Sequence, residues 1–255
     1  MGKLIRSDFH IHTIHSECGE PGATPWATVR AAQEAGLEAI ALTDHVAFPA
    51  HFSAPKLVRE QLPADLGGVR VYVGCEAEML GRGKPSISRE YAAEMDLVLF
   101  SASHLHNADP RLLHKAEPPA IASFVLDLMV GAIETGYADI LAHPFHVPLC
   151  RHSFGIIASA ANERDLRDAL AMTAEAGVAM ETNPRFLRQE PAEAAWLFRL
   201  FMEMGCKVAI NSDTHHPSGV GCRGPKFATE AELRAIGISE EHLFSIEERR
   251  TRQLH

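Results

Sequence analysis

The chain has 255 residues, of which 46% are hydrophobic and 22% are charged, so it is long enough to bury a full core within one domain. Its net charge of −9 and its pI near 5.9 argue against broad, non-specific binding to nucleic acid or to an anionic membrane. The first residues lack the apolar stretch of a signal peptide, and no segment approaches the roughly 18 apolar residues of a membrane span. We therefore expect a soluble, cytoplasmic protein.

Short apolar runs alternate with amphipathic stretches along the chain. Strands are expected at residues 4–10, 39–43, 69–74, 97–102, 140–142, 178–181 and 208–211. A helix is expected at residues 25–35, where Thr24 can cap the first turn and Gly36 can end the last. Further helices are expected at about residues 121–135, 163–176 and 192–204, the last two followed by Gly177 and Gly205. The walls or lid of a pocket are expected from the longest irregular stretches, residues 17–24, 104–119 and 144–161.

Polar side chains that can bind metals follow nearly every expected strand. They are His10, His12, His45, Glu76, His104, His143, Glu181, Asp213 and His215. Alternating strand and helix units predict a parallel sheet, which can be doubly wound or closed into a barrel. Groups from so many strand ends can meet only if the ends form a ring, so the pattern favours a seven-stranded β/α barrel. We expect a single domain over residues 1–255.

The side-chain types in this set predict a cluster of cations. His10 and His12 lie on the same side of an extended strand, because side chains alternate with period two, and both can hold one ion. The Glu76 carboxylate can bridge two ions, which a neutral imidazole cannot do. Asp213 and His215 again place two ligand types two residues apart. Together these positions predict a metal-dependent active site.

The cysteines and the other histidines show no such pattern. The five cysteines are odd in number and lack CxxC spacing, which argues against a disulfide framework and a zinc ribbon. We expect most of them to be small buried residues. Ordinary surface or core positions are expected for His51, His114, His152, His242 and His255.

The set of motifs resembles the polymerase and histidinol phosphatase (PHP) domain family of metal-dependent phosphoesterases. The matching stretches are Asp8-Phe9-His10-Ile11-His12-Thr13, Leu42-Thr43-Asp44-His45, Gly74-Cys75-Glu76-Ala77-Glu78, Ser103-His104, Ala142-His143-Pro144 and Asn211-Ser212-Asp213-Thr214-His215. They occur in family order and span nearly the whole chain. The resemblance implies a distorted (β/α)7 barrel, similar to a TIM barrel, that binds two to three divalent metal ions such as Zn, Mn or Fe.

The resemblance also implies which residues bind each ion. The first ion would take His10, His12, Glu76 and Asp213, the second Glu76, His104 and His143, and the third His45, His215 and a group from the loop after His12. The family places Asp or His five or six residues past the second histidine, where this chain has Glu17 and Cys18. We prefer Glu17, because a hard carboxylate suits a site with two imidazoles, whereas Cys18 would favour softer zinc. His15 is a third possibility.

The reaction implied by the resemblance is hydrolysis of a phosphomonoester or phosphodiester at a trinuclear site. A hydroxide that bridges two ions would attack phosphorus in line, and the ions would offset the charge that develops. Asp44, next to the expected ligand His45, is expected to fix the orientation of an imidazole. His146 and His216 are candidates for a general acid.

Arginines outside the metal ligands are expected to set specificity. Residues 181–183 resemble the family's E-x-N segment, after which an arginine often meets the substrate phosphate. Arg185 or Arg188 could hold a phosphate oxygen through two hydrogen bonds. Arg223 and Lys226 are weaker candidates of the same kind.

A small phosphorylated molecule is the expected substrate, and several alternatives stay open. Histidinol-phosphate phosphatase is the runner-up, favoured by residues 212–217 and the E-x-N segment. An amidohydrolase-type C–N hydrolase also uses HxH on its first strand, but it expects a bridging lysine that no strand end supplies here. An oligonucleotide exonuclease remains possible, although the acidic composition argues against stable binding to duplex. A metal-stabilised, non-enzymatic partner module would have lost ligands that this chain retains.

Overall fold

The computed structural model describes residues 3–248, apart from the side chain of His114, so the expectations for His114 and His255 lie outside the described part of the chain. The strand segments there are β1 (Ser7–Ile11), β2 (Ala39–Leu42), β3 (His45–Val46), β4 (Arg70–Val73), β5 (Cys75–Glu78), β6 (Val98–Ser101), β7 (Ile140–Ala142), β8 (Ala179–Thr182) and β9 (Lys207–Ile210). They form two sheets, of order β1-β2-β4 and β3-β5-β6-β7-β8-β9. Every pairing between these strands is parallel, which confirms the predicted α/β class.

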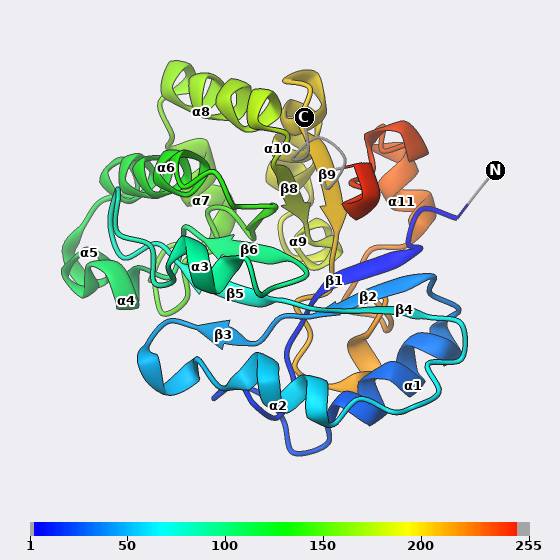
Figure 1. Ribbon diagram of the computed structural model, residues 1–255. Helices are drawn as coiled ribbons and strands as arrows, with labels where there is room; N and C mark the ends of the chain where they lie inside the picture. Colours follow the sequence, from blue (N-terminus) through cyan, green and yellow to red (C-terminus); the bar gives the residue numbers. More distant parts are fainter. Residues whose placement is uncertain (1–2, 249–255) are drawn as a thin grey trace.

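Helices connect the strands and cover them from both sides (Figure 1). The helices are α1 (Pro25–Ala35), α2 (Ala54–Glu60), α3 (Arg89–Ala92), α4 (Leu105–Ala108), α5 (Pro110–Lys115), α6 (Pro118–Glu134), α7 (Phe154–Ser159), α8 (Glu163–Ala176), α9 (Pro184–Gln189), α10 (Pro191–Glu203) and α11 (Glu230–Ala235). Short 3-10 turns are η1 (Pro49–His51), η2 (Pro217–Gly219) and η3 (Glu240–His242). Figure 1 shows α1 and α2 below the strands and α6, α8 and α10 above them.

Two of the strands are interrupted where they pass from one sheet to the other. β2 and β4 lie in the sheet with β1, whereas β3 and β5, which follow them along the chain, lie in the larger sheet. Gly74 is the one residue between β4 and β5, and a Cβ added there would lie 2.1 Å from the carbonyl oxygen of Leu97. Only glycine permits this close approach. When β2–β3 and β4–β5 are counted as interrupted strands, the chain order is that of the seven predicted strands.

The first strand contacts the segment that follows the last strand. Ile11 and Thr214 form an isolated parallel bridge, and the amide of His12 donates to the carbonyl of Thr214 at 2.9 Å. The amide of Phe9 also donates to the side chain of Asn211 at 2.9 Å. In the described residues no continuous ladder joins β1 to β9. The strands therefore follow the order of a distorted barrel whose final seam consists of one bridge and a few hydrogen bonds.

Two hydrophobic clusters fill the molecule. The larger one packs the outward-facing strand residues against the helices, and the smaller one joins alternate strand positions such as Ala41, Leu99 and Ala142. Because side chains alternate along a strand, the inward face of β8 continues from Ala179 to Glu181. The inward face therefore changes from apolar residues to polar ones toward the carboxyl ends of the strands.

The predicted elements recur with small shifts at their ends. α1 and α8 match residues 25–35 and 163–176, the Thr24 side chain caps α1, and Gly36 ends it with a φ of 63°. β5 was not predicted, so Glu76 lies within a strand rather than after one. Stretches expected to be irregular contain α4, α5 and α7, which have four to six residues. Helices this short do not show a recognisable period in the sequence.

The structure also shows the state of the cysteines and the character of the helices. Cys75, Cys206 and Cys222 are buried, Cys18 is exposed, and all five cysteines are free thiols. None of the helices within residues 3–248 combines the length and the apolar composition needed to cross a membrane.

Candidate metal centre

A pocket of about 470 Å³ lies at the carboxyl ends of the strands. Its lining includes most of the residues predicted to form the site, namely Glu17, His45, Glu76, His104, His143, His146, Arg185, Asp213 and His215. His10 and His12 lie below this surface and are fully buried. The pocket is therefore the entrance to a buried polar cluster.

The histidines and carboxylates assigned above to the metal ions converge in this cluster. Ligand atoms within 4.8 Å of one another form overlapping groups, which are His10–His12–Glu76, His10–His143–Asp213, Glu76–His104–His143, His45–Glu78–His104 and His12–Cys18–His45–His215. These groups contain eight of the nine candidate residues at the strand ends, and the ninth, Glu181, belongs to none of them. The spacing suits several ions held side by side.

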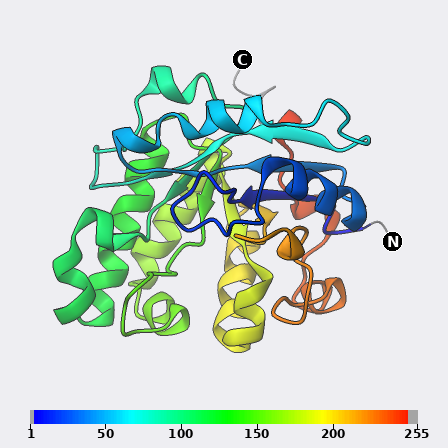
Figure 2. The same ribbon diagram turned by 90° about the horizontal axis from the view of Figure 1, so that it is seen from below.

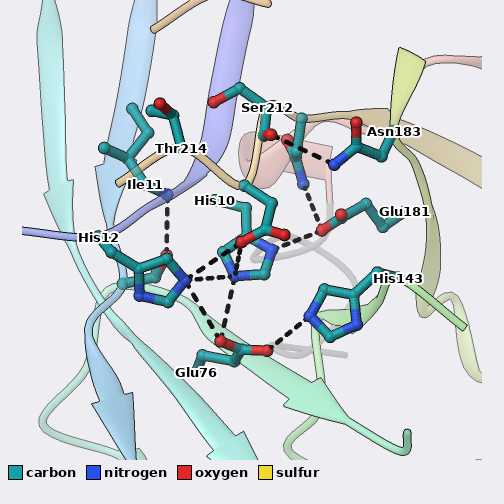
Figure 3. A network of polar contacts seen from close by, with 12 residues as sticks. His10, Ile11, His12, Glu76, His143, Glu181, Asn183, Ser212 and Thr214 are labelled. Atoms are coloured by element: carbon teal, nitrogen blue, oxygen red, sulfur yellow. Dashed lines mark hydrogen bonds and ion pairs between the residues drawn. The ribbon is translucent and has the colours of Figure 1, made fainter. Parts of the chain in front are cut away.

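Glu76 lies at the centre and faces both sides (Figure 3). Its Oε2 atom is 3.2 Å from His10 Nε2 and 3.4 Å from His12 Nε2. Its Oε1 atom is 3.0 Å from His143 Nε2 and 4.0 Å from His104 Nε2. One carboxylate oxygen therefore points to each group of imidazoles, which is the arrangement that a bridging ligand requires.

Asp213 completes the first group from the opposite side. Its Oδ1 atom lies 3.8 Å from His10 Nε2 and 3.4 Å from His12 Nε2. The backbone of Asp213 has a φ of 49°, and that of His143 has a φ of 25°. Such positive φ values are uncommon for residues other than glycine and are concentrated at functional sites. The backbone strain therefore falls on Asp213 and His143, two of the central ligands.

The outer nitrogen of each central imidazole contacts a polar group that sets the direction of the ring. His10 Nδ1 lies 2.7 Å from Glu181 Oε2, and His104 Nδ1 lies 2.7 Å from Glu78 Oε1. Further contacts are His12 Nδ1 to Ser16 Oγ at 3.2 Å and His143 Nδ1 to Ser103 Oγ at 3.1 Å. Partners of this kind orient metal-binding histidines and raise their basicity. All four rings consequently direct Nε2 to the interior of the cluster.

The donor set fits divalent ions. Glu76, Glu78, Glu181 and Asp213 are buried together, and buried carboxylates need a compensating positive charge. Glu76 Oε2 accepts no hydrogen bond from the described residues although three imidazole nitrogens lie within 3.4 Å. The Nε2 atoms of His10 and His12 approach to 3.1 Å. Cations between these atoms would account for both features, and carboxylate oxygen with imidazole nitrogen suits zinc, manganese or iron.

The electrostatics of the protein groups follow from burial and proximity. Burial raises the pKa of Glu76, but the neighbouring imidazoles of His45 and His10 outweigh it and hold that pKa well below its usual range. Burial, together with nearby imidazoles, lowers the pKa of His45 to about 2 and that of His215 to about 4. Burial also raises the pKa of Glu78. At His10 and His104 burial lowers the pKa, but Glu181 and Glu78, respectively, outweigh burial and raise it. Near neutral pH the centre therefore presents anionic Glu76 and neutral imidazoles at His45 and His215, whereas His10 and His104 would release a proton on binding a metal.

The loop after His12 does not place Glu17 in the cluster. The Glu17 side chain is 87% exposed, and its Oε1 atom lies 3.3 Å from His51 Nε2 at the mouth of the pocket. Cys18 is the loop residue grouped with His45 and His215. His15 belongs to none of the groups formed by the described residues. The preference for Glu17 as third-ion ligand is thus not supported by its position.

Asp44 does not contact the imidazoles directly but reaches them through Ser16. Its carboxylate accepts hydrogen bonds from the Thr13 amide at 2.6 Å, the Thr13 hydroxyl at 2.7 Å and the Ser16 hydroxyl at 2.8 Å. Ser16 in turn contacts His12 and accepts a hydrogen bond from the amide of His45 at 3.0 Å. Asp44 therefore anchors the loop and Ser16, and the serine contacts the ring.

Of the predicted general acids and phosphate-binding residues, some line the pocket and others lie outside it. Arg185 lines the pocket and donates to Asp213 Oδ2 at 3.0 Å. His146 also lines the pocket, but burial, with His143 and Arg185 nearby, lowers its pKa to about 3, so its ring is neutral near pH 7. His216 is exposed and bonds to Ser218 outside the pocket, which places it away from any reaction there.

The other basic candidates lie elsewhere. Arg188 donates to the Phe227 carbonyl at 3.1 Å and to Glu232 at 2.8 Å, and it does not line the pocket. Arg223 and Lys226 are exposed and are likewise outside the lining.

The sequence interpretation missed several residues of the site. Glu78 was quoted in a motif but given no role, although it lies two residues after Glu76 and hence on the same face of β5. Ser16 carries no sequence signal, because its contacts depend on the fold of the loop. His51, expected to be an ordinary histidine, lines the pocket together with Phe48 and Leu149.

Relatives of known sequence support an assignment to phosphatases. The chain is 28% identical to a probable histidinol-phosphatase of Deinococcus radiodurans over 253 residues, which covers 90% of this chain and 93% of the relative. It is 27% identical to a probable phosphatase of Syntrophotalea carbinolica, a match that covers 92% of this chain and 90% of the relative.

A solved structure with a similar fold is histidinol phosphate phosphatase from Lactococcus lactis, crystallised with zinc, L-histidinol and phosphate. The TM-score is 0.64 with 18% identity, and the match covers 93% of this chain and 95% of that chain. At this identity the likeness concerns the fold, which is the TIM-like arrangement predicted above.

The family assignment rests on the matched region and agrees with the clustered ligands. The protein is a metal-dependent hydrolase of phosphoester bonds that uses more than one divalent ion. Residues 8–186, well over half of the sequence, match the PHP domain, and the chain therefore belongs to the PHP domain family.

Proposed function

We propose that this protein is a phosphatase that releases inorganic phosphate from a small phosphomonoester of the histidinol-phosphate type. The observation that carries the proposal is the position of Glu76, with one oxygen facing His10 and His12 and the other facing His143. Full-length similarity to a probable histidinol-phosphatase supports the monoester and its class. The location proposed for this activity is the cytoplasm.

The residues of the pocket would have different roles in such a reaction. Divalent ions at the centre would supply Lewis acidity, which makes water more acidic and attracts phosphate oxygens. The chain contributes Glu76 and Asp213, which hold positive charge at the base of the pocket. One N–H group of Arg185 donates to Asp213 Oδ2 at 3.0 Å, and the other N–H groups of its guanidinium can donate to a phosphate oxygen. Glu181, Glu78 and the serines keep the imidazoles in place.

The C–N hydrolase alternative has less support from the site. That chemistry expects a lysine that bridges two ions, and among the described residues the pocket lining contains no lysine. The bridging position is held by Glu76. An exonuclease that accepts a short strand is the second candidate within phosphoester chemistry, and stable duplex binding is not part of the proposal.

An activity assay tests the proposal directly. The protein is stripped of metal, reconstituted with zinc or manganese, and assayed against histidinol phosphate, nucleotides, cyclic nucleotides and short oligonucleotides. We expect phosphate release to be fastest with histidinol phosphate or a similar small monoester. Faster cleavage of cyclic nucleotides or oligonucleotides would replace the proposal by a diesterase, and turnover of an amide alone would refute it.

Arg185 provides a test at the level of one residue. Replacing it by alanine removes a charge-assisted hydrogen bond, worth roughly 1.5–3 kcal/mol, so kcat/KM for the monoester should fall by about 10- to 100-fold. Arg188→Ala is the matched control, because Arg188 bonds to Phe227 and Glu232 outside the pocket. Metal content, measured by elemental analysis, should be unchanged in both variants. Equal effects of the two substitutions on kcat/KM would contradict a role in phosphate binding.

A further inference from the structure

The loop between β1 and α1 presents a thiol to the metal centre. Cys18 Sγ lies within 4.8 Å of a ring nitrogen of His12, His45 and His215. Two ligand atoms of one tetrahedral zinc ion lie about 3.6 Å apart, because Zn–S is about 2.3 Å and Zn–N is about 2.1 Å. The atoms of the observed group lie within 4.8 Å of one another, so side-chain rotations that bring them closer by up to about 1.2 Å would let them share one ion.

Hydrogen bonds within the loop and to distant segments hold the loop in this position. The Ser16 hydroxyl donates to Asp44, and the Gly19 amide donates to the Ser16 carbonyl at 3.0 Å. The Glu20 amide donates to the carbonyl of His215 at 3.1 Å, which ties the segment after Cys18 to the segment that carries another ligand. In Figure 2 this dark blue loop lies beside the orange segment that follows β9.

Gly19 is required for the turn that follows Cys18. A Cβ at Gly19 would lie 1.8 Å from the carbonyl oxygen of Thr13, so the loop can fold back on itself only with glycine. The turn leaves Cys18 facing the pocket and Glu17 facing the solvent and His51.

We propose that the Cys18 thiolate binds a third ion together with His45 and His215, and that it makes this position selective for a thiophilic metal such as zinc. Thiolate favours zinc over manganese and magnesium, whereas carboxylate does not make this distinction strongly. The centre then combines harder positions around Glu76 with one softer position at Cys18. The proposal concerns the same centre as the phosphatase activity but is independent of which ester is cleaved.

Cobalt(II) gives a readout that does not depend on activity. Cobalt bound to a thiolate has a charge-transfer absorption in the near ultraviolet that oxygen and nitrogen ligands do not produce. We expect this band in the cobalt-loaded protein, its loss in Cys18→Ser, and its retention in Cys150→Ser, the matched control. Elemental analysis of the zinc-loaded protein should show one ion fewer in Cys18→Ser. Cys18→Asp should restore the ion and lower the zinc-to-manganese preference at least tenfold.

Alkylation of the unmodified protein tests the proposal even if a variant does not fold. Zinc should slow the reaction of Cys18 with iodoacetamide at least tenfold, followed by mass spectrometry, and leave Cys150 unchanged. The absence of the cobalt band in protein with three bound ions, or equal Cys18 alkylation with and without zinc, would overturn the proposal. A protein with the band but no phosphate release from any ester would instead refute the proposed function and leave Cys18 as a ligand.

Discussion

At the scale of single residues, the centre depends on groups that do not themselves face the ions. Glu181 Oε2 lies 2.7 Å from His10 Nδ1, and the Asn211 amide donates to the same oxygen at 3.4 Å. The second oxygen of Glu181 is buried without a hydrogen bond from the described residues. A buried carboxylate with one oxygen left without a hydrogen bond needs positive charge nearby. His10 carries the most positive charge next to Glu181 when a cation binds its Nε2 atom.

Glu181→Gln should therefore weaken metal binding without emptying the site. The amide keeps the volume but removes the negative charge that faces His10, so zinc affinity is expected to fall by about 10- to 100-fold. Competition with a chromogenic chelator measures the change. Glu203→Gln, on the exposed surface of α10, is the control and should bind zinc normally. An unchanged zinc affinity in Glu181→Gln would show that the carboxylate does not support His10.

At the scale of elements, the break at Gly74 determines where Glu76 lies. β4 pairs with β2, and after one residue the chain continues as β5 in the other sheet, between β3 and β6. Cys75 and Ala77 then pack in the larger core cluster, which leaves Glu76 and Glu78 on the inward face. The interruption of the strand is thus part of how the bridging carboxylate reaches the centre.

A methyl group at position 74 should consequently destabilise the fold. In Gly74→Ala the added Cβ would meet the Leu97 carbonyl at 2.1 Å, and overpacking of this kind costs roughly 1–3 kcal/mol or more. Gly22→Ala is the control, because its nearest neighbour would be a His216 ring nitrogen at 3.6 Å, an ordinary contact. Denaturant unfolding of both variants measures the difference. Equal free energies of unfolding for Gly74→Ala and Gly22→Ala would contradict the prediction, because they would show that the backbone at residues 74 and 97 moves apart without loss of stability.

At the scale of the whole molecule, the ions connect parts of the chain that the hydrogen-bonded sheets leave separate. The ligands come from β1 and the residue after it, from β3 and β5, and from the segments after β6, β7 and β9. Among the described residues, one isolated bridge joins the end of β1 to the segment after β9. An ion bound by His10, Glu76 and Asp213 would join three of these segments. Metal binding should therefore stabilise the folded state as a whole and not only the pocket.

Removal of the ions should lower the unfolding temperature. One ion at 100 times its dissociation constant contributes about 2.7 kcal/mol, which corresponds to several degrees for a chain of this length. Differential scanning calorimetry with and without a chelator checks the effect. Glu76→Gln should show a smaller zinc-induced increase and should lose two ions together in elemental analysis. An identical increase in this variant would refute the bridging role of Glu76.

The sequence alone was sufficient for the order of the strands and for eight of the side chains that converge in the cluster. Strand periodicity and helix caps depend on neighbours in the sequence, so α1 with Thr24 and Gly36 could be predicted residue by residue. The histidines and carboxylates could be predicted because they stand at the polar ends of apolar runs. Their types specify metal chemistry wherever the chain brings them together.

Only the tertiary structure decided which neighbouring side chain faces the centre. Glu17 and Cys18 are adjacent, and no local preference distinguishes them. Hydrogen bonds from distant segments, such as Ser16 to Asp44 and Glu20 to His215, turn the loop so that the thiol faces inward. His216, by contrast, is directed outward by a local bond to Ser218, two residues further along the chain. The direction of the Cys18 side chain depends on contacts far away in the sequence, and such contacts exist only once the chain has folded.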